Sequence, residues 1–325
     1  MAPLSRIGSL AAAATLLAST ALAQGYPERQ ITMVVPFAAG GPTDTVGRLV
    51  AERMSEQLGQ QILIENVGGA GGTLGAAQVA GAEPDGYTIL LHHIGMATSE
   101  TLYRELPYET TTAFAPIGLV TEVPMTIVAR ADFEPADIAS FVAYVKENAD
   151  TITMANAGIG SASHLCGMLF MQATESPIVT VPYRGAGPAM TELVGGQIDI
   201  MCDQTTNTTE QIKGGTVKAY AVTAPERLEI LPDLPTTAES GLPGVEVTVW
   251  HGLYAPAGTP PEAVERLSAA LQSALADPGI AEQLAELGTA PSPAEDATPA
   301  ALEARLTEEL ARWKPIIEEA GVYAD

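Results

Sequence analysis

The feature of this sequence that most limits its fold is a short apolar run that passes through a glycine-rich turn into an amphipathic helix. Residues 31–35 (Ile-Thr-Met-Val-Val) are a short, largely apolar run in which most residues are β-branched, and this predicts a buried strand. Pro36 ends the strand, and residues 38–41 (Ala-Ala-Gly-Gly) are too small and flexible to continue it. Pro42, Thr43 and Asp44 then supply helix-start residues, and apolar side chains recur at helical spacing as far as Leu58.

This arrangement predicts an anion-binding loop. A strand, a glycine-rich turn and a helix N-terminus place several N–H groups around one small volume, at the positive end of the helix dipole. The loop has no Gly-Lys-Ser/Thr sequence, and no lysine or arginine lies between Ile31 and Gly47, so a nucleotide phosphate is a poor candidate for the anion. An ordinary tight turn is the alternative.

The next segments repeat the pattern and predict a parallel sheet. Residues 61–66 form a second expected strand, glycines at 68–72 lead into a small-residue helix at 73–82, and residues 87–92 form a third strand. A β-α-β-α-β order implies right-handed crossovers, with the ligand crevice at the carboxyl ends of the strands. His92 and His93 lie at that end, and one of them is expected to line the pocket.

The middle of the chain contains a second strand that leads through a glycine-rich loop into a helix. Strands at 117–120 and 125–129, around Pro124, look like the passage into a second domain. The strand expected at 151–156 runs into a Gly/Ser-rich loop at 157–163 and then a helix. Two similar α/β halves, each with a glycine-rich loop at a helix start, predict a two-lobed receptor that closes on a ligand between the lobes.

Later strand ends supply further candidates. Tyr183 follows the strand at 179–182, and Asp203 follows the strand at 198–202. Asp203 either accepts from a hydroxyl or a protonated carboxyl of the ligand or caps a turn, and the residues leave both roles open. Helices at 262–276 and 299–320 are expected to close the chain.

Residues 1–23 have the pattern of a secretory signal peptide. Arg6 precedes an uncharged Ala/Leu-rich stretch, and Ala21 and Ala23 are the small residues that a signal peptidase needs, which predicts cleavage after Ala23. The apolar stretch is too short and too interrupted for a membrane anchor. The mature chain is therefore expected in the periplasm.

Charge limits the partners of this chain. The formal net charge is −24, from 15 basic and 39 acidic residues, and loss of Arg6 makes it one unit more negative. Nucleic acid and anionic membrane surfaces are therefore excluded as partners. An anionic ligand would have to be recognised by local donors such as helix N-termini.

The two cysteines and the histidines bear on redox state and metals. Cys166 and Cys202 would meet an oxidising compartment, which favours one disulfide, with two buried free thiols as the alternative. No Cys/His cluster has zinc-ligand spacing, and adjacent His92 and His93 would point to opposite sides of a strand. No metal site is expected.

Motifs along the whole mature chain resemble one protein family. They are Tyr26-Pro27, Val34-Val35-Pro36-Phe37-x-Ala-Gly-Gly-x-x-Asp44, Pro84-Asp85-Gly86-Tyr87, Gly158-x-Gly160-Ser161-x-x-His164-Leu165, Val181-Pro182-Tyr183-Arg184-Gly185, Leu193-x-Gly195-Gly196-Gln197-x-Asp199, Ala221-Val222-Thr223, Leu234-Pro235-Thr236-x-x-Glu239-x-Gly241, and Trp250-x-Gly252-Leu253-x-Ala255-Pro256-x-Gly258-Thr259-Pro260. Together they resemble the Bug proteins, the TctC-like periplasmic receptors of tripartite tricarboxylate transporters.

The resemblance implies an α/β fold of the two-lobed periplasmic-binding-protein (Venus flytrap) type, with mainly parallel sheets flanked by helices. It implies a discontinuous first domain (24–123 and 228–325) and a second domain (124–227). It further implies a monomeric, non-enzymatic receptor without a cofactor, which captures a small aromatic or aliphatic carboxylate through backbone amides and waters. The receptor would deliver that ligand to the membrane permease subunits of a tripartite transporter.

The resemblance also implies which residues contact the ligand. Carried onto this sequence, the first-loop contacts are Phe37, Ala39, Gly40, Thr43 and Asp44, and the second-loop contacts are Gly160, Ser161 and His164. Gly41 and Gly158 of the same loops, with His93, Tyr183 and Asp203, complete the candidate site. Cys166, Cys202 and the polar run from Asp203 resemble a subgroup that includes receptors for aromatic carboxylates such as terephthalate.

Two other function classes are alternatives. Ser161 and His164 are three residues apart, which suggests a serine hydrolase, but Ser163 stands where the nucleophile elbow Gly-x-Ser-x-Gly needs glycine. Ser161 is therefore interpreted as a helix cap and ligand donor, and His164 as either a ligand contact or a buried histidine bonded to backbone. A binding protein that presents its ligand to a signalling partner is the other alternative.

Overall fold

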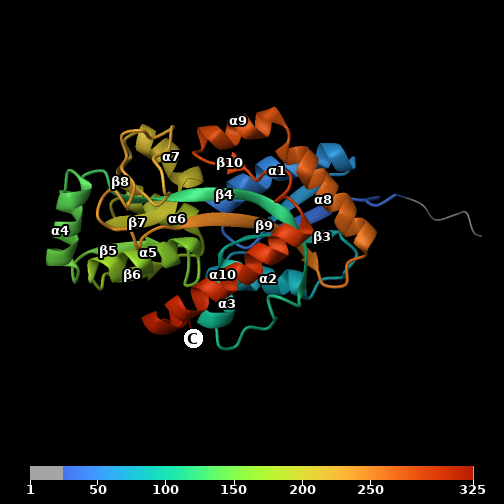
Figure 1. Ribbon diagram of the computed structural model, residues 1–325, viewed down its shortest axis with the longest axis horizontal. Coiled ribbons are helices and arrows are strands. Elements are labelled where there is room, and N and C mark those ends of the chain that lie inside the picture. The colour runs from blue at the N-terminus through green and yellow to red at the C-terminus, as the bar shows by residue number, and fades with distance from the viewer. Residues whose placement is uncertain (1–24, 325) are drawn as a thin grey trace, which may run out of the picture.

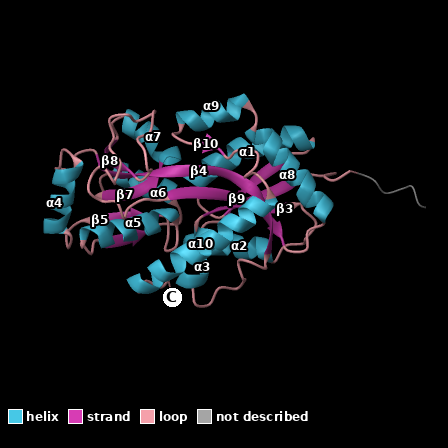
Figure 2. Cartoon of the chain, in the orientation of Figure 1, coloured by secondary structure: helices cyan, strands magenta, loops and turns pink. Residues whose placement is uncertain are grey.

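The computed structural model describes residues 25–324, so the predicted signal peptide lies outside the described residues. Ten strands form one curled sheet in the order β2-β1-β3-β9-β4-β7-β5-β6, with β8 and β10 also paired to β4. Helices cover both faces of the sheet (Figures 1 and 2). The expected α/β architecture is confirmed.

The elements fall into two groups along the sheet, which we name the first and second lobes (Figure 1). The first lobe contains β1 (Ile31–Val35), β2 (Ile62–Asn66), β3 (Thr88–His93), β9 (Thr248–Pro256), β10 (Ala290–Pro291), a 3-10 turn (Ala70–Gly72), α1 (Pro42–Leu58), α2 (Thr73–Ala80), α3 (Gly95–Leu102), α8 (Pro261–Leu275), α9 (Pro278–Glu286) and α10 (Pro299–Ala320). The second lobe contains β5 (Thr153–Asn156), β6 (Val179–Pro182), β7 (Ile200–Gln204), β8 (Val217–Val222), α4 (Ile138–Asn148), α5 (Ala162–Thr174), α6 (Ala186–Val194) and α7 (Thr205–Lys213).

The lobes share one long strand, β4 (Phe114–Arg130), which replaces the two strands expected around Pro124. That expectation is wrong because Pro124 lies where β4 changes partners. The pairing with β9 ends at Pro124, and the pairing with β7 begins at Met125. A missing N–H is tolerated at such a junction because no ladder hydrogen bond depends on it.

The parallel β-α-β-α-β unit is present as predicted. β1 pairs in parallel with both β2 and β3, and α1 ends at Gly59, whose φ of +69° suits a left-handed helix cap. The second lobe repeats this order, since β5 pairs in parallel with β6 and β7. The carboxyl ends of β1, β3 and β5 therefore face the region where the two lobes meet.

Three helices were not predicted: α3, α7 and α9. The threonine-rich start of α7 has poor intrinsic helix propensity, which explains why the sequence did not predict a helix there. The helix forms because its threonines are buried and bonded: Thr208 Oγ1 lies 2.7 Å from Thr126 Oγ1, and Thr205 Oγ1 donates to the Gly288 carbonyl at 3.2 Å. Strand β7 also extends to Gln204, so Asp203 lies inside the strand.

The apolar core runs through both lobes. The largest cluster joins Val34 and Trp250 of the first lobe to Phe141 and Phe170 of the second through residues of β4. Trp250 and Tyr254 of β9 belong to this core and are each 1% exposed. The boundaries at 123/124 and 227/228 stay a prediction. Within residues 25–324 no helix is long and apolar enough to cross a bilayer.

Candidate functional site

A small cavity lies where the first residues of four helices meet. Its walls come from α1, α5, α6 and the β7–α7 junction, together with the end of β1 and β3; the lining residues are Phe37, Pro42, Thr43, His93, Ala157, Ser161, Ala162, Ser163, Ala186, Asp203 and Gln204. The enclosed space is about 10 Å³, room for about one water molecule. A larger ligand can enter only if the lobes move apart.

Three of the four helices reach this cavity with N-termini that no side chain caps. The N-cap residues Gly41 of α1, Gly185 of α6 and Gln204 of α7 make no side-chain capping hydrogen bond. Their first N–H groups thus retain no side-chain acceptor, at the positive ends of the helix dipoles. The cavity is therefore suited to an anion.

The first loop is held by Asp44, which is not among the residues that line the cavity. Its carboxylate accepts hydrogen bonds from the backbone N–H of Gly40, from Arg48 Nε and from Asn66 Nδ2, each at 2.9 Å. Burial raises the pKa of Asp44, but these donors outweigh it and hold the pKa below its usual range. The side chain is fully occupied by anchoring the loop.

Aromatic rings form one wall of the cavity. The rings of Phe37 and His93 stack with centroids 4.5 Å apart, and His251 meets His93 edge-on at 5.9 Å. Thr43 Oγ1 lies 3.3 Å from His251 Nε2, which ties α1 to β9. Burial lowers the pKa of His251 and of His92 to about 3, and burial also pulls the pKa of His93 well below 6.5, so this wall is neutral at physiological pH.

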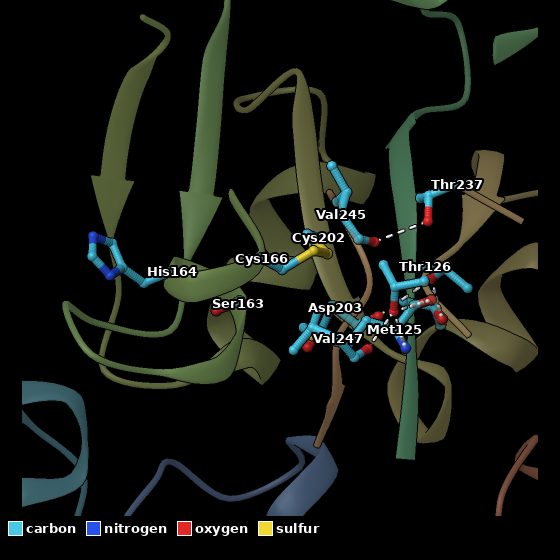
Figure 3. The surroundings of a disulfide bond; sticks show 12 residues. Met125, Thr126, Ser163, His164, Cys166, Cys202, Asp203, Thr237, Val245 and Val247 are labelled. Carbon is cyan, nitrogen blue, oxygen red and sulfur yellow. Dashed lines mark hydrogen bonds between the residues drawn. A yellow bond between two sulfur atoms is a disulfide. The ribbon is translucent and has the colours of Figure 1, made fainter. Parts of the chain in front are cut away.

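The second loop offers two hydroxyl groups. Ser161 caps α5 by accepting from the backbone N–H of His164 at 3.3 Å, and its Oγ lies 3.1 Å from Ser163 Oγ. Ser163 Oγ in turn accepts from the Ala157 N–H at 2.7 Å. The ring of His164 is turned away from Ser163 and the disulfide (Figure 3), and its Nδ1 accepts from Gly160 N–H at 3.3 Å.

The remaining polar wall comes from β7. Asp203 and Gln204 are 1% and 3% exposed. Asn207 Nδ2 donates to Asp203 Oδ2 at 2.5 Å, and burial raises the pKa of Asp203 to about 7. Gln204 Oε1 is buried and has no hydrogen-bond partner within residues 25–324.

Around the cavity the two lobes contact each other through hydrogen bonds to backbone carbonyls and through close approaches at glycine residues. Ala38 N–H donates to the Arg184 carbonyl at 3.2 Å, and the Tyr103 hydroxyl donates to the Ile159 carbonyl at 2.8 Å. A Cβ added to Gly71 would lie 2.0 Å from the Ile159 oxygen, and one added to Gly185 would lie 2.8 Å from Ala38 N. Glycine at these positions allows the lobes to close this tightly.

The structure brings five of the predicted site residues onto the cavity wall: Phe37, Thr43, His93, Ser161 and Asp203. The others surround it without lining it in the described structure: Ala39, Gly40, Gly41, Asp44, Gly158, Gly160, His164 and Tyr183. Sequence reasoning missed the wall residues Pro42, Ala157, Ala162, Ser163, Ala186 and Gln204. Five of these lie within two residues of a predicted one, so only Ala186, at the start of α6, had no nearby signal.

Cys166 and Cys202 form a disulfide with a Cα–Cα distance of 6.0 Å (Figure 3), which confirms the favoured interpretation over two free thiols. Cys202 immediately precedes Asp203, and Cys166 lies three residues after Ser163. Within the described residues no group of three or more His, Cys, Asp or Glu side chains is placed to hold a metal ion.

Comparison with known proteins gives a consistent result. The family described as tripartite tricarboxylate transporter family receptor matches residues 46–322. A UPF0065 protein of Agrobacterium vitis, from the TAR-I ttuE-ttuC' intergenic region, is 54% identical over 98% of this chain and 92% of its own.

Solved structures are similar over nearly the whole described chain. The periplasmic binding protein BugD shares 53% identity with a TM-score of 0.90, covering 92% of this chain and 99% of its own. MatC from Rhodopseudomonas palustris, with bound malate, shares 42% identity with a TM-score of 0.87, covering 90% of this chain and 100% of its own. A second R. palustris protein, with adipate, shares 32% identity with a TM-score of 0.87, covering 92% and 99%.

Proposed function

This chain belongs to the tripartite tricarboxylate transporter receptor family, and on that premise we propose that it captures a small carboxylate in the cavity between its lobes and delivers it to a membrane permease. The family is one of periplasmic solute-binding receptors, which supports a binding role and not a catalytic one. The proposal goes further in naming the ligand class, the site and the transport partner.

The observation that carries the proposal is the set of uncapped helix N-termini at one cavity. The N-terminal N–H groups of α1, α6 and α7 have no side-chain acceptor, and the Ser161 and Ser163 hydroxyls lie beside them. A ligand carboxylate can accept from several of these donors at once, in a site closed to water. The backbone amides supply positive potential without a buried cation.

Local donors are needed because the protein as a whole repels anions. Its net charge is −24, and the lining contains no lysine or arginine among the described residues. Long-range attraction therefore cannot concentrate an anionic ligand, and charge effects beyond roughly 8 Å are screened at physiological salt. Affinity would come from short-range hydrogen bonds made after the lobes close.

The related proteins with bound malate and adipate support the carboxylate class, since both molecules are small dicarboxylates. In this proposal the two lobes correspond to domains 24–123 with 228–325 and 124–227. The chain acts as a periplasmic monomer, and closure around the ligand creates the surface that the permease subunits recognise.

The proposal is tested on the mature protein, from Gln24 to Asp325. A thermal-shift screen uses dicarboxylates (malate, succinate, adipate), citrate, aromatic carboxylates (terephthalate, benzoate) and amino acids, with the corresponding neutral amides as controls. At least one carboxylate should raise the midpoint, as mass action requires, while its amide does not. Stabilisation by none of them, or equally by the amides, would contradict carboxylate capture.

A further inference from the structure

We propose, resting on the function proposed above, that this cavity selects carboxylates that also bear an ammonium group, and that Asp203 is the residue that recognises that group. The uncapped N-termini of α1 and α6 would hold the carboxylate. The β7 end of the cavity would hold the ammonium.

The cavity wall contains two chemically different polar sets. The uncapped N-termini of α1 and α6, with the Thr43, Ser161 and Ser163 hydroxyls, offer hydrogen-bond donors. The consecutive residues Asp203 and Gln204 offer acceptor oxygens. A simple monocarboxylate can use only the first set, because it has no donor for the second.

Asp203 lacks a cationic partner within the protein. None of the ion pairs among residues 25–324 includes it. Its contacts are neutral donors: Asn207 Nδ2 at 2.5 Å and the backbone N–H of Gln204. The other titratable group on the cavity wall, His93, is fully buried and uncharged. A buried carboxylate is unfavourable without a counter-charge, which a ligand ammonium would supply.

Gln204 gives the second, independent indication. Gln204 lines the cavity, and its Oε1 is buried with no hydrogen-bond partner within the described residues. An unmade hydrogen bond at a buried acceptor is costly, so a ligand N–H that reaches this oxygen would gain binding energy. An ammonium has three donors and can satisfy Asp203 and Gln204 together, whereas a hydroxyl has one.

The competing assignment is a dicarboxylate, with a protonated Asp203 donating to the second carboxylate. Burial does raise the pKa of Asp203 to about 7. In that arrangement Gln204 Oε1, as it lies in the structure, would still have no donor, whereas an ammonium supplies donors to both Asp203 and Gln204. The acceptor pair therefore favours the ammonium.

The test uses matched ligands that differ only at carbon 2. Each series contains an amino acid, the hydroxy acid and the unsubstituted acid: alanine, lactate and propionate; aspartate, malate and succinate; glutamate, 2-hydroxyglutarate and glutarate. Calorimetry on the mature wild-type protein measures the affinity for each ligand. In the series whose carbon chain has the length that fits the cavity, the amino acid should bind at least about tenfold more tightly than the unsubstituted acid.

Asp203→Asn isolates the contribution of the charge. The variant is nearly isosteric and should abolish the preference for the amino acid, measured as the ratio of the dissociation constants of the unsubstituted acid and the amino acid for the same variant. Asp150→Asn, the same change at an exposed turn of the second lobe, is the control and should keep the wild-type preference. A persisting preference in Asp203→Asn would overturn the assignment of the ammonium to Asp203.

The outcomes separate the two proposals. If unsubstituted acids bind as tightly as amino acids, or if Asp203→Asn tightens dicarboxylate binding, the ammonium proposal is wrong and carboxylate capture stands. If no member of any series binds, and the wider carboxylate screen also fails, carboxylate capture is wrong and the ammonium proposal falls with it.

Discussion

Cys166 and Cys202 join the helix and the strand that carry the second lobe's share of the cavity wall. Their disulfide, with a Cα–Cα distance of 6.0 Å, links α5 three residues after Ser163 to β7 one residue before Asp203 (Figure 3). The hydroxyl donors of α5 and the acceptors of β7 are thereby held in a fixed relation before a ligand arrives. Such preorganisation reduces the entropy cost of binding.

Removing this disulfide should lower both stability and affinity. For a sequence separation of 36 residues, the chain-entropy relation gives a loss of about 4 kcal/mol in the free energy of unfolding for Cys166→Ser/Cys202→Ser. Urea unfolding of the variant and of the wild type, each with and without reductant, measures the loss. Reductant should destabilise only the wild type. Equal stability of all four samples would mean that the bond contributes nothing.

A carboxylate placed at the start of α5 should block the anion site. Ala162 is the first residue of α5 and lies on the cavity wall, where an aspartate side chain would meet the N–H groups intended for the ligand. Because opposing like charges cost several kcal/mol, Ala162→Asp should weaken carboxylate binding by about 100-fold or more in calorimetry.

The matched control for that experiment is Ala300→Asp. Ala300 lies in the first turn of α10, is exposed and is not on the cavity wall, so an aspartate there gains the same favourable interaction with a helix dipole. It should keep wild-type affinity. Equal loss in both variants would point to a general effect of acidity, and no loss in Ala162→Asp would place the ligand elsewhere.

Closure of the lobes should depend on Gly71. An added Cβ would lie 2.0 Å from the Ile159 carbonyl oxygen across the junction between lobes, so Gly71→Ala should keep the lobes apart. Ligand affinity should fall at least about tenfold because the closed state becomes less populated. Small-angle scattering with saturating ligand should show a larger radius of gyration than for the wild type.

Gly196→Ala provides a control with the same backbone cost. Gly196 has a φ of +71°, close to the +61° of Gly71, but an added Cβ there meets nothing within 4 Å. Both variants should lose about 1–2 kcal/mol of stability from the left-handed conformation. Only Gly71→Ala should lose affinity, and a similar loss in both would attribute the effect to stability and not to closure.

The unliganded protein should lose stability through Asp203 as pH rises. Burial raises the pKa of this carboxyl from 3.8 to about 7 in the folded state, so between these values the folded state keeps a proton that the unfolded state releases. Unfolding therefore releases a proton, and the contribution of Asp203 to the free energy of unfolding falls as pH increases from 3.8 to about 7 and is constant above.

The buried histidines change the free energy of unfolding with pH in the opposite direction, so their contribution has to be subtracted from the measurement. Burial lowers the pKa of His92 and His251 from 6.5 to about 3, so they destabilise the folded state as pH falls below 6.5. The quantity to measure by urea unfolding is the wild-type free energy minus that of Asp203→Asn, in which the histidine contributions cancel. A difference that does not change with pH would show that Asp203 titrates normally.

Much of the fold could be read from local patterns. The strand, glycine-rich loop and helix at residues 31–58 follow from β-branched residues, small residues and helical periodicity, each of which acts over a few positions. The same local rules located the second loop and the helix that Ser161 caps. They failed for α7, because threonine hydroxyls bonded across the fold outweigh a weak helix propensity.

The candidate site was predicted only in part. Loop glycines and hydroxyls identified both loops at the cavity, yet Ala186 carries no local signal, since it reaches the cavity only because helix starts converge in space. Asp44 shows the converse. It has the expected helix-start position, but its three hydrogen bonds to the first loop and its surroundings are visible only in the structure.

The sequence by itself determined the βα units and the two glycine-rich loops at helix starts, because each depends on residues close together in the chain. Tertiary structure decided that β4 is one strand shared by both lobes and that four helix starts meet at one cavity. It also decided that Asp203 and Gln204 are buried there without a cation or a complete set of partners. Those properties depend on burial and on distances between remote segments, which only the packed chain sets.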